Sequence, residues 1–158
     1  MNRRSTLALA LSLGLTVSFN SAFAQQNALK DQLVGAWTLV TADAFGSKPK
    51  GQMIFDANGH FSATLLRDTL PKIAANNRLQ GTPEENKAIV GGSLVFFGTY
   101  SVNGTDLKIR VEGSSYPNWD ETSQTRTNVS VSGDELKYTQ PSPSGGGPAT
   151  VVIWKRAK

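Results

Sequence analysis

The chain has 158 residues, a formal net charge of +4, one histidine and no cysteine. The missing cysteines exclude a disulfide framework and a cysteine-linked lipid anchor, and a single histidine excludes a metal site built from several histidine or cysteine ligands. The basic residues are scattered without forming a basic run, which argues against nucleic acid as a partner. We therefore predict a fold that is held together by its own core, with no metal and no cofactor.

The first residues have the features of a secretory signal peptide. A start that contains Arg3 and Arg4 precedes a mostly apolar stretch over residues 7–19, and Ala22-Phe23-Ala24 offers a small-x-small cleavage site. Polar residues interrupt the apolar stretch, which is shorter than the ~20 apolar residues of a spanning helix. We predict cleavage after Ala24, no membrane span, and a periplasmic or secreted protein. Residues 25–158 then form one domain, whose charge is +2 without the two arginines.

The remaining chain alternates short β-rich segments with turn residues. A short helix is expected over residues 26–32, with Leu29 and Leu33 placed to pack under the fold. Asn58-Gly59 and Asn103-Gly104 are typical of tight turns between antiparallel strands. The expected strands cover residues 37–41, 52–55, 60–66, 93–102, 106–113, 125–131, 135–140 and 149–156, and a loop rich in Gly, Ser and Pro covers residues 141–148.

A longer stretch, residues 67–92, separates the third expected strand from the fourth. Within it Thr82 is a typical N-cap, Pro83 suits the first helical position, and Glu85 completes a capping box. We therefore interpret Glu84 and Glu85 as residues of a helix start rather than as a catalytic pair of carboxylates. This helical excursion is expected to cover one mouth of the fold.

Eight strands joined mostly by tight turns predict an all-β protein, an eight-stranded antiparallel up-and-down barrel. Closure removes the two edges that an open sheet would expose, and most strand pairs lack the crossover helix of a parallel sheet. In residues 107–112 apolar and charged side chains alternate, which assigns one face to the interior. The expected interior residues are Trp37, Leu39, Phe61, Ala63, Leu65, Leu94, Phe96, Tyr100, Leu107, Ile109 and Val111.

Several segments, taken in order, resemble the lipocalin-like domain family, a branch of the calycin barrels. The resemblance spans about residues 33–156. The segments that carry it are Leu33–Val40, Lys50–Phe55, Asp56–Gly59, Gly81–Glu85, Tyr116–Trp119, Gly145–Gly147 and Val152–Arg156. It implies a β-barrel with an internal cavity more directly than it implies a reaction.

The resemblance also implies a structural seal at the barrel floor. In lipocalins the Trp of a Gly-x-Trp step lies across the floor, and a basic residue of the last strand stacks on it. Here the step is Gly35 to Trp37, and the basic residue is Arg156, with Lys155 as the alternative. A guanidinium over an indole gains cation–π and packing energy. Histidines that relatives often carry before the Pro-Asn-Trp motif are missing here, so no activity that depends on them is implied.

The candidate binding residues form two groups. Apolar residues on expected strands, Phe61, Leu65, Phe96 and Tyr100, would line a cavity. Polar and aromatic residues near a strand end would orient a ligand at the barrel mouth: Arg67, Arg110, Glu112, Tyr116, Asn118 and Trp119. The alternative is that Tyr116 and Trp119 plug the barrel while Arg110 and Glu112 lie on its outer face. The single His60 follows a turn and is interpreted as a solvated turn residue.

Three functions fit this sequence. The first is an exported barrel, monomer or weak dimer, that binds a small, largely apolar molecule by burial of apolar surface. The second is a cyclase or isomerase that uses the cavity as a mould, with Tyr116 or Glu112 as an acid. The third is a barrel filled by its own side chains, with a structural or interaction role and an apolar outer patch around Val95 and Phe97.

Overall fold

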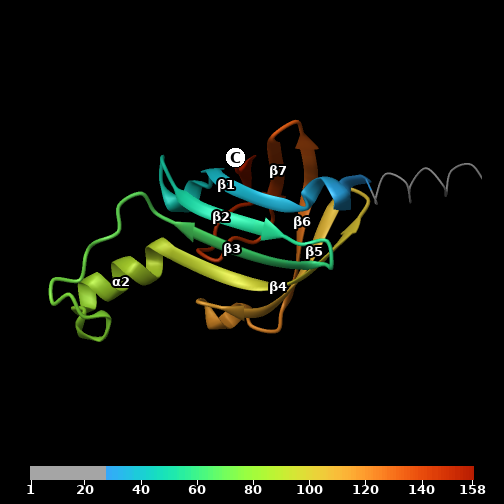
Figure 1. The fold of residues 1–158 in the computed structure, drawn as a ribbon. Helices are drawn as coiled ribbons and strands as arrows, with labels where there is room; N and C mark the ends of the chain where they lie inside the picture. Colours follow the sequence, from blue (N-terminus) through green and yellow to red (C-terminus); the bar gives the residue numbers. More distant parts are fainter. Residues whose placement is uncertain (1–27) are drawn as a thin grey trace, which may run out of the picture.

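The computed structural model describes residues 28–158, so the predicted signal peptide lies outside the described residues. Eight antiparallel strands close into one barrel in which neighbours in sequence are neighbours in space (Figure 1). This confirms the predicted fold class. The strands are β1 (Gly35–Thr41), β2 (Lys50–Phe55), β3 (His60–Leu66), β4 (Ser93–Asn103), β5 (Asp106–Ser114), β6 (Ser123–Ser132), β7 (Glu135–Gln140) and β8 (Thr150–Arg156).

Closure occurs where the first strand meets the last. Trp37 pairs with Met53 of β2 on one side and with Arg156 of β8 on the other. Tight turns join most strands, as the turn residues predicted. Gly104 between β4 and β5 has φ 61°, a left-handed conformation that glycine adopts without steric cost. The barrel therefore presents two ends, a floor near the start of β1 and a mouth near its end.

The floor is sealed by the segment that leads into β1. Residues 28–33 are helical, which agrees with the described part of the expected helix, and Leu33 is fully buried. The indole Nε1 of Trp37 donates to the Leu33 carbonyl at 2.8 Å. The guanidinium carbon of Arg156 lies 4.2 Å from the centroid of the Trp37 ring, and the same guanidinium donates to the backbone carbonyls of Val34 and Gln32. The residue that stacks on Trp37 is therefore Arg156 rather than Lys155.

The backbone conformation and the close contact with Arg156 explain why residue 35 is a glycine. Its φ is 127°, and a Cβ atom added there would lie 3.0 Å from Nη1 of Arg156. A larger residue would therefore strain the backbone and press on the guanidinium. The Gly-x-Trp step places glycine where the basic side chain crosses the chain.

The middle of the barrel is filled by aromatic rings. Phe55 and Tyr100 meet edge to face with centroids 4.9 Å apart, and Phe61 and Phe96 do so at 5.7 Å. Such edge-to-face pairs add to the free energy gained by burial. All eleven interior residues predicted from the alternation are buried, including Leu39, Ala63, Leu65, Leu94, Leu107, Ile109 and Val111.

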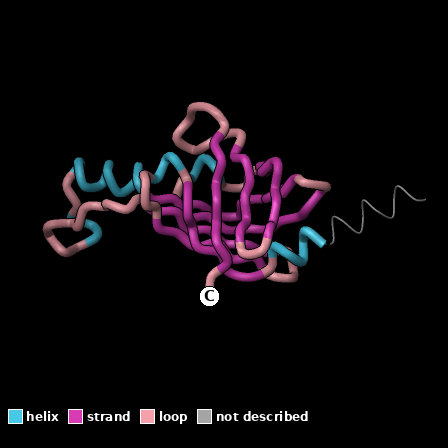
Figure 2. Tube along the Cα trace, turned by 90° about the horizontal axis from the view of Figure 1, so that it is seen from above, coloured by secondary structure: helices cyan, strands magenta, loops and turns pink. Residues whose placement is uncertain are grey.

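The helical excursion does not cover a mouth, so that expectation is wrong. It contains the short 3-10 helix η2 (Arg78–Gln80) and α2 (Pro83–Gly92), and α2 starts with the predicted capping box at Thr82 and Glu85. Helix α2 ends at Gly92 and β4 begins at the next residue, so the helix extends away from the barrel instead of folding back (Figures 1 and 2).

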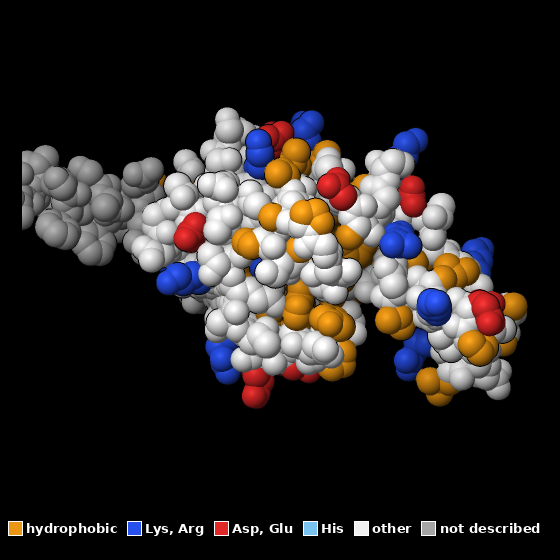
Figure 3. Space-filling model, turned by 180° about the vertical axis from the view of Figure 1, so that it is seen from behind, with side chains coloured by type: hydrophobic (Ala, Val, Ile, Leu, Met, Phe, Trp, Pro, Cys, Tyr) orange, Lys and Arg blue, Asp and Glu red, His pale blue; other side chains and the backbone are white. Residues whose placement is uncertain are grey.

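The excursion forms an arm with apolar side chains on its surface. Leu79 is 80% exposed and Val90 is 73% exposed. Figure 3 shows hydrophobic and charged side chains interspersed over this protruding segment. Val95 and Phe97 on the outer face of β4 are also exposed, because the arm leaves them uncovered. No helix in the described part of the chain is long and apolar enough to cross a membrane.

Candidate functional site

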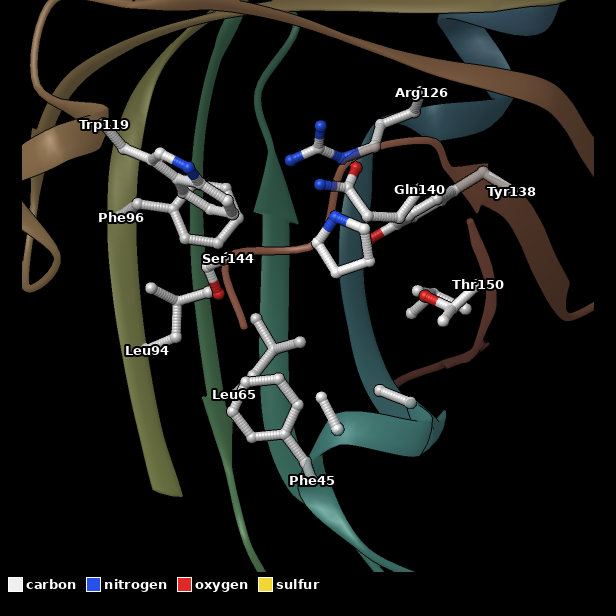
Figure 4. A pocket seen from close by; sticks show the side chains of 14 residues that line it. Phe45, Leu65, Leu94, Phe96, Trp119, Arg126, Tyr138, Gln140, Ser144 and Thr150 are labelled. Atoms are coloured by element: carbon white, nitrogen blue, oxygen red, sulfur yellow. The ribbon is translucent and has the colours of Figure 1, made fainter. Parts of the chain in front are cut away.

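The site lies at the mouth of the barrel, opposite the Trp37 floor. Three segments close over this end: the 3-10 helix η1 (Asp43–Phe45) after β1, the 3-10 helix η3 (Pro117–Trp119) after β5, and the loop between β7 and β8. Beneath them is a cavity of about 50 Å³. It is lined by Ala42, Ala44, Phe45, Leu65, Leu94, Phe96, Trp119, Arg126, Tyr138, Gln140, Pro143, Ser144, Thr150 and Val152 (Figure 4).

An irregularity in β6 turns Arg126 into the barrel. The pairing of β6 with β7 shifts register between Thr127 and Ser130, and Asn128 has φ 54°. A bulge of this kind adds a residue to one strand and breaks its alternation of faces. Arg126 and Val129 are consequently both buried although they lie three residues apart. Strict alternation from Val129 would have turned Arg126 outward.

Arg126 is a cation in an almost dry position. Its side chain is only 4% exposed, and its Nη2 donates to Gln124 Oε1 at 3.0 Å. The guanidinium carbon lies 5.9 Å from the ring centroid of Trp119. No carboxylate among residues 28–158 lies within 4.0 Å of its guanidinium nitrogens. The ion pair found within that distance in the described chain joins His60 to Asp56 and does not involve Arg126. Burial lowers the pKa of Arg126, and the neighbouring Tyr138 hydroxyl offsets part of this effect.

Gln140 contributes a second buried polar group. Its amide nitrogen donates to the carbonyl of Ser142 at 2.7 Å, which ties the end of β7 to the following loop. Its Oε1 is buried and has no hydrogen-bond partner in the described chain. Figure 4 shows the amide of Gln140 beside the guanidinium of Arg126, with Trp119 and Phe96 across the cavity. An unsatisfied buried acceptor is costly, so this oxygen is free to accept a hydrogen bond from a group that enters the cavity.

A groove runs along the outside of the same residues. Beyond the Thr127–Thr139 pair no ladder pairing joins β6 to β7, and a groove of about 400 Å³ lies between them. Trp119, Arg126 and Gln140 line both this groove and the cavity. Its volume is within the range of about 300–1,000 Å³ that is typical of small-molecule sites. Trp119, Arg126 and Gln140 therefore lie between the small apolar cavity and the larger, more polar groove.

The structure brings only some of the predicted binding residues together. Leu65, Phe96 and Trp119 line the cavity, with the Trp119 ring 5.3 Å from that of Phe96. Phe61 and Tyr100 are buried in the aromatic layer and do not line this cavity; the Tyr100 hydroxyl donates to the Asp56 carbonyl at 2.7 Å. Trp119 is thus the one residue of the predicted polar and aromatic cluster that reaches the cavity.

The other members of that cluster lie at the surface. Arg110 is exposed and donates to the backbone carbonyl of Glu121, and Arg67 is exposed and donates to the carbonyl of Ala44. Glu112 is exposed on β5, and Tyr116 and Asn118 are exposed on or beside η3. The Tyr116 ring packs on Trp119 with centroids 6.0 Å apart. Their contact with a ligand stays a prediction.

Sequence reasoning missed Arg126, Tyr138 and Gln140. Tyr138 and Gln140 lie on the same face of β7 as the buried Leu136, because alternate residues of a strand face the same side. The sequence of Glu135–Gln140 alone could therefore have predicted their burial. The signal for Arg126 is weaker: Asn128, a residue that tolerates the left-handed conformation, marks the bulge that reverses the strand. Burial raises the pKa of the Tyr138 hydroxyl, so this group stays protonated beside Arg126.

Metal ligands do not gather in the described chain. Residues 28–158 contain no group of three or more His, Cys, Asp or Glu side chains that would hold a metal ion. His60 is exposed and its Nδ1 lies 3.2 Å from Asp56 Oδ2, as expected for a solvated turn residue. The chemistry of the mouth is therefore that of one cation, hydrogen-bonding groups and apolar walls.

Comparison with known proteins identifies the fold family. The model of the lipocalin-like domain matches residues 34–157, which is most of the chain. No curated protein matches the chain.

Proposed function

We propose, from the premise that this chain belongs to the lipocalin-like domain family, that it is an exported barrel that binds a small, largely apolar molecule at its mouth. The observation that carries the proposal is the cavity beneath η1 and η3. Its walls are mostly apolar, and Arg126, Tyr138 and Gln140 add a few convergent polar groups. This combination is the usual composition of a small-molecule site.

The volume of the cavity limits what enters without rearrangement. About 50 Å³ is a third of the ~150 Å³ engineered cavity that admits benzene. A ligand of that size needs the mouth to open or needs to extend into the groove between β6 and β7. The loop between β7 and β8 is the segment to displace, because it reaches the cavity through Pro143 and Ser144 while residues 145–149 are exposed.

Binding is tested with the neutral apolar dye N-phenyl-1-naphthylamine on the folded chain. Val152→Phe fills the cavity from within, whereas Val151→Phe places the same ring on the exposed outer face of the same strand. We expect dye fluorescence with the wild type and with Val151→Phe, and at least a tenfold weaker affinity with Val152→Phe. Circular dichroism shows that each variant is folded. Equal binding by both variants would place the dye elsewhere and contradict the proposal.

The alternatives predict different results. A cyclase or isomerase needs an acid in the cavity, and the titratable residues among its lining are Arg126 and Tyr138. A raised pKa makes the Tyr138 hydroxyl a weaker proton donor, which favours binding over catalysis. A filled barrel with a structural role would bind no dye in any variant. Native mass spectrometry of gently purified protein adds a direct test, because a bound ligand appears as an extra mass that denaturation removes.

Export is a separate part of the proposal. It is supported by the basic start, the apolar stretch and the Ala22-Phe23-Ala24 site of the sequence. N-terminal sequencing of protein recovered from the periplasm or medium of a bacterial host is expected to begin at Gln25. Recovery of the full chain in the cytoplasm alone would contradict this prediction.

A further inference from the structure

The buried cation at the mouth has no carboxylate counter-ion among residues 28–158. Arg126 has five N–H donors in a planar fork; in the described chain its Nη2 donates to Gln124 Oε1, and the Tyr138 hydroxyl is a second polar neighbour. Taking a charge out of water is unfavourable unless the charge is paired and hydrogen-bonded. The arginine at the floor differs, because the guanidinium of Arg156 donates hydrogen bonds to two backbone carbonyls. Arg126 therefore presents donors that suit an anion, and residues 28–158 do not supply one.

Gln140 is an independent observation at the same place. The hydrogen bond from its nitrogen to Ser142 fixes the amide, so that Oε1 is the atom left without a donor. The residue is only 7% exposed, and so bulk water does not serve this oxygen freely. A molecule that satisfies both residues carries an anionic acceptor for Arg126 and a hydroxyl or N–H for Gln140. A hydroxylated carboxylic acid has both groups.

The walls specify the rest of the molecule. Opposite Arg126 the cavity is bounded by Phe96 and Trp119, whose rings meet edge to face. Leu65 and Leu94 lie below them (Figure 4). These side chains offer no charge, so a group that lies between them is apolar or aromatic and carries no second charge. Because the cavity is about 50 Å³, an aromatic ring enters only when the mouth opens or when part of it stays in the groove. An arginine fork also matches a planar carboxylate through two parallel hydrogen bonds.

We propose that the mouth recognises a small monocarboxylic acid with an apolar, aromatic-sized body and a neighbouring hydroxyl group, with Arg126 binding the carboxylate and Gln140 accepting from the hydroxyl. This inference rests on the proposed function, because it names the class of ligand for the same cavity. The acid lies at the boundary that Arg126 and Gln140 form between the cavity and the groove.

The test uses three matched ligands in isothermal titration calorimetry. Benzyl alcohol carries a neutral hydroxymethyl group, benzoate carries a carboxylate in its place, and 3-hydroxybenzoate adds a hydroxyl that cannot hydrogen-bond to its own carboxylate. We expect affinity to rise in that order in the wild type. Arg126→Met is expected to weaken benzoate binding about tenfold or more without weakening benzyl alcohol. Gln140→Leu is expected to remove the gain from the 3-hydroxyl group only. Lys108→Met deletes a cation on the exposed outer face of β5 and is expected to change nothing.

Each outcome separates this inference from the proposed function. Equal affinity for benzoate and benzyl alcohol, or a benzoate preference that survives Arg126→Met, overturns the acid site and leaves an apolar barrel. Binding of the neutral dye without binding of any of the three ligands has the same meaning. Absence of binding by the dye and by all three ligands overturns both proposals. If Arg126→Met does not fold, Arg126→Lys retains the charge without the fork and is expected to weaken benzoate alone.

Discussion

The two ends of the barrel each combine an arginine with a tryptophan, and the two pairs differ in what satisfies the cation. At the floor Arg156 lies 4.2 Å from the Trp37 ring centroid, is partly exposed, and donates to two backbone carbonyls. At the mouth Arg126 lies 5.9 Å from the Trp119 ring centroid, is buried, donates to the Gln124 side-chain amide beside the Tyr138 hydroxyl, and has no carboxylate within 4.0 Å among residues 28–158. The first cation is bonded to backbone carbonyls and partly reached by solvent, whereas the second is buried without a carboxylate partner in the described chain.

The same difference separates stability from function. A stacked guanidinium whose donors end on backbone carbonyls ties three segments of chain together and lowers the free energy of the fold. A buried cation without a counter-ion raises the free energy of the folded state, because no ion pair offsets the loss of hydration. Unfavourable groups of this kind are common at binding sites, where a bound ligand supplies the missing interaction. The floor is thus the stabilising end of this barrel and the mouth is its candidate binding end.

The tryptophans offer the largest test of this comparison. Trp37→Ala removes a fully buried indole together with its hydrogen bond to Leu33 and is expected to cost about 3–5 kcal/mol of unfolding free energy. Trp119→Ala removes a partly exposed ring on η3 and is expected to cost about 1 kcal/mol. Urea denaturation measures both. Equal losses would mean that the mouth is as much a part of the stabilising core as the floor.

The arginines sharpen the comparison with a smaller effect. Arg156→Met removes two hydrogen bonds from a cation to backbone carbonyls and is expected to destabilise by about 2 kcal/mol. Arg126→Met replaces a buried charge by an apolar chain of similar length and is expected to be neutral or stabilising. The two midpoints in urea are therefore predicted to move in different directions. A loss in Arg126→Met as large as that in Arg156→Met would show that the mouth cation is satisfied within the chain.

Predictability from sequence also differs between the two ends. The floor follows from the family resemblance, which implied a seal by Trp37 and a basic residue of the last strand; the structure decides for Arg156 over Lys155. The mouth depends on where alternation fails. The bulge at Asn128 turns Arg126 inward, and the predicted cations Arg67 and Arg110 lie at the surface. Period-two patterning predicts a strand face only as long as the strand stays regular.

The arm was predicted as an element but not in its position. The capping box at Thr82 and Glu85 is a short-range feature, so the sequence alone was sufficient to place the helix start. The direction of α2 depends on the lack of a turn between Gly92 and Ser93, a property of backbone geometry that composition does not encode. The start of the helix could therefore be predicted from the sequence, whereas the direction of the arm relative to the barrel could not.

The arm provides a test of whether either end depends on it. Thr82→Ala removes the side-chain acceptor for the Glu85 amide and is expected to destabilise α2 by about 1 kcal/mol. Because α2 contributes little buried surface, the effect is expected to remain local. Hydrogen exchange is expected to accelerate in residues 83–92 while the thermal midpoint of the barrel stays unchanged. A lowered midpoint would show that the arm supports the mouth.

The smallest predicted effect is a dependence on pH that differs between the ends. At the floor end the His60 backbone N–H lowers the pKa of Asp56, so the stability it contributes is lost as the pH falls through the folded-state value. At the mouth end burial raises the pKa of Tyr138, so the folded chain retains a proton that the unfolded chain releases above about pH 10. Stability is then lost as the pH rises above that value.

Tyr138→Phe isolates the alkaline part. The variant has no hydroxyl to titrate, so its thermal midpoint is expected to fall less than that of the wild type between about pH 9 and 11. Burial and Asp56 also raise the pKa of Tyr100, and part of the decline is therefore expected to remain. Parallel curves for the two proteins would mean that Tyr138 releases its proton as readily when folded as when unfolded. The mouth would then admit water around Arg126, and its contrast with the partly exposed Arg156 of the floor would no longer depend on burial.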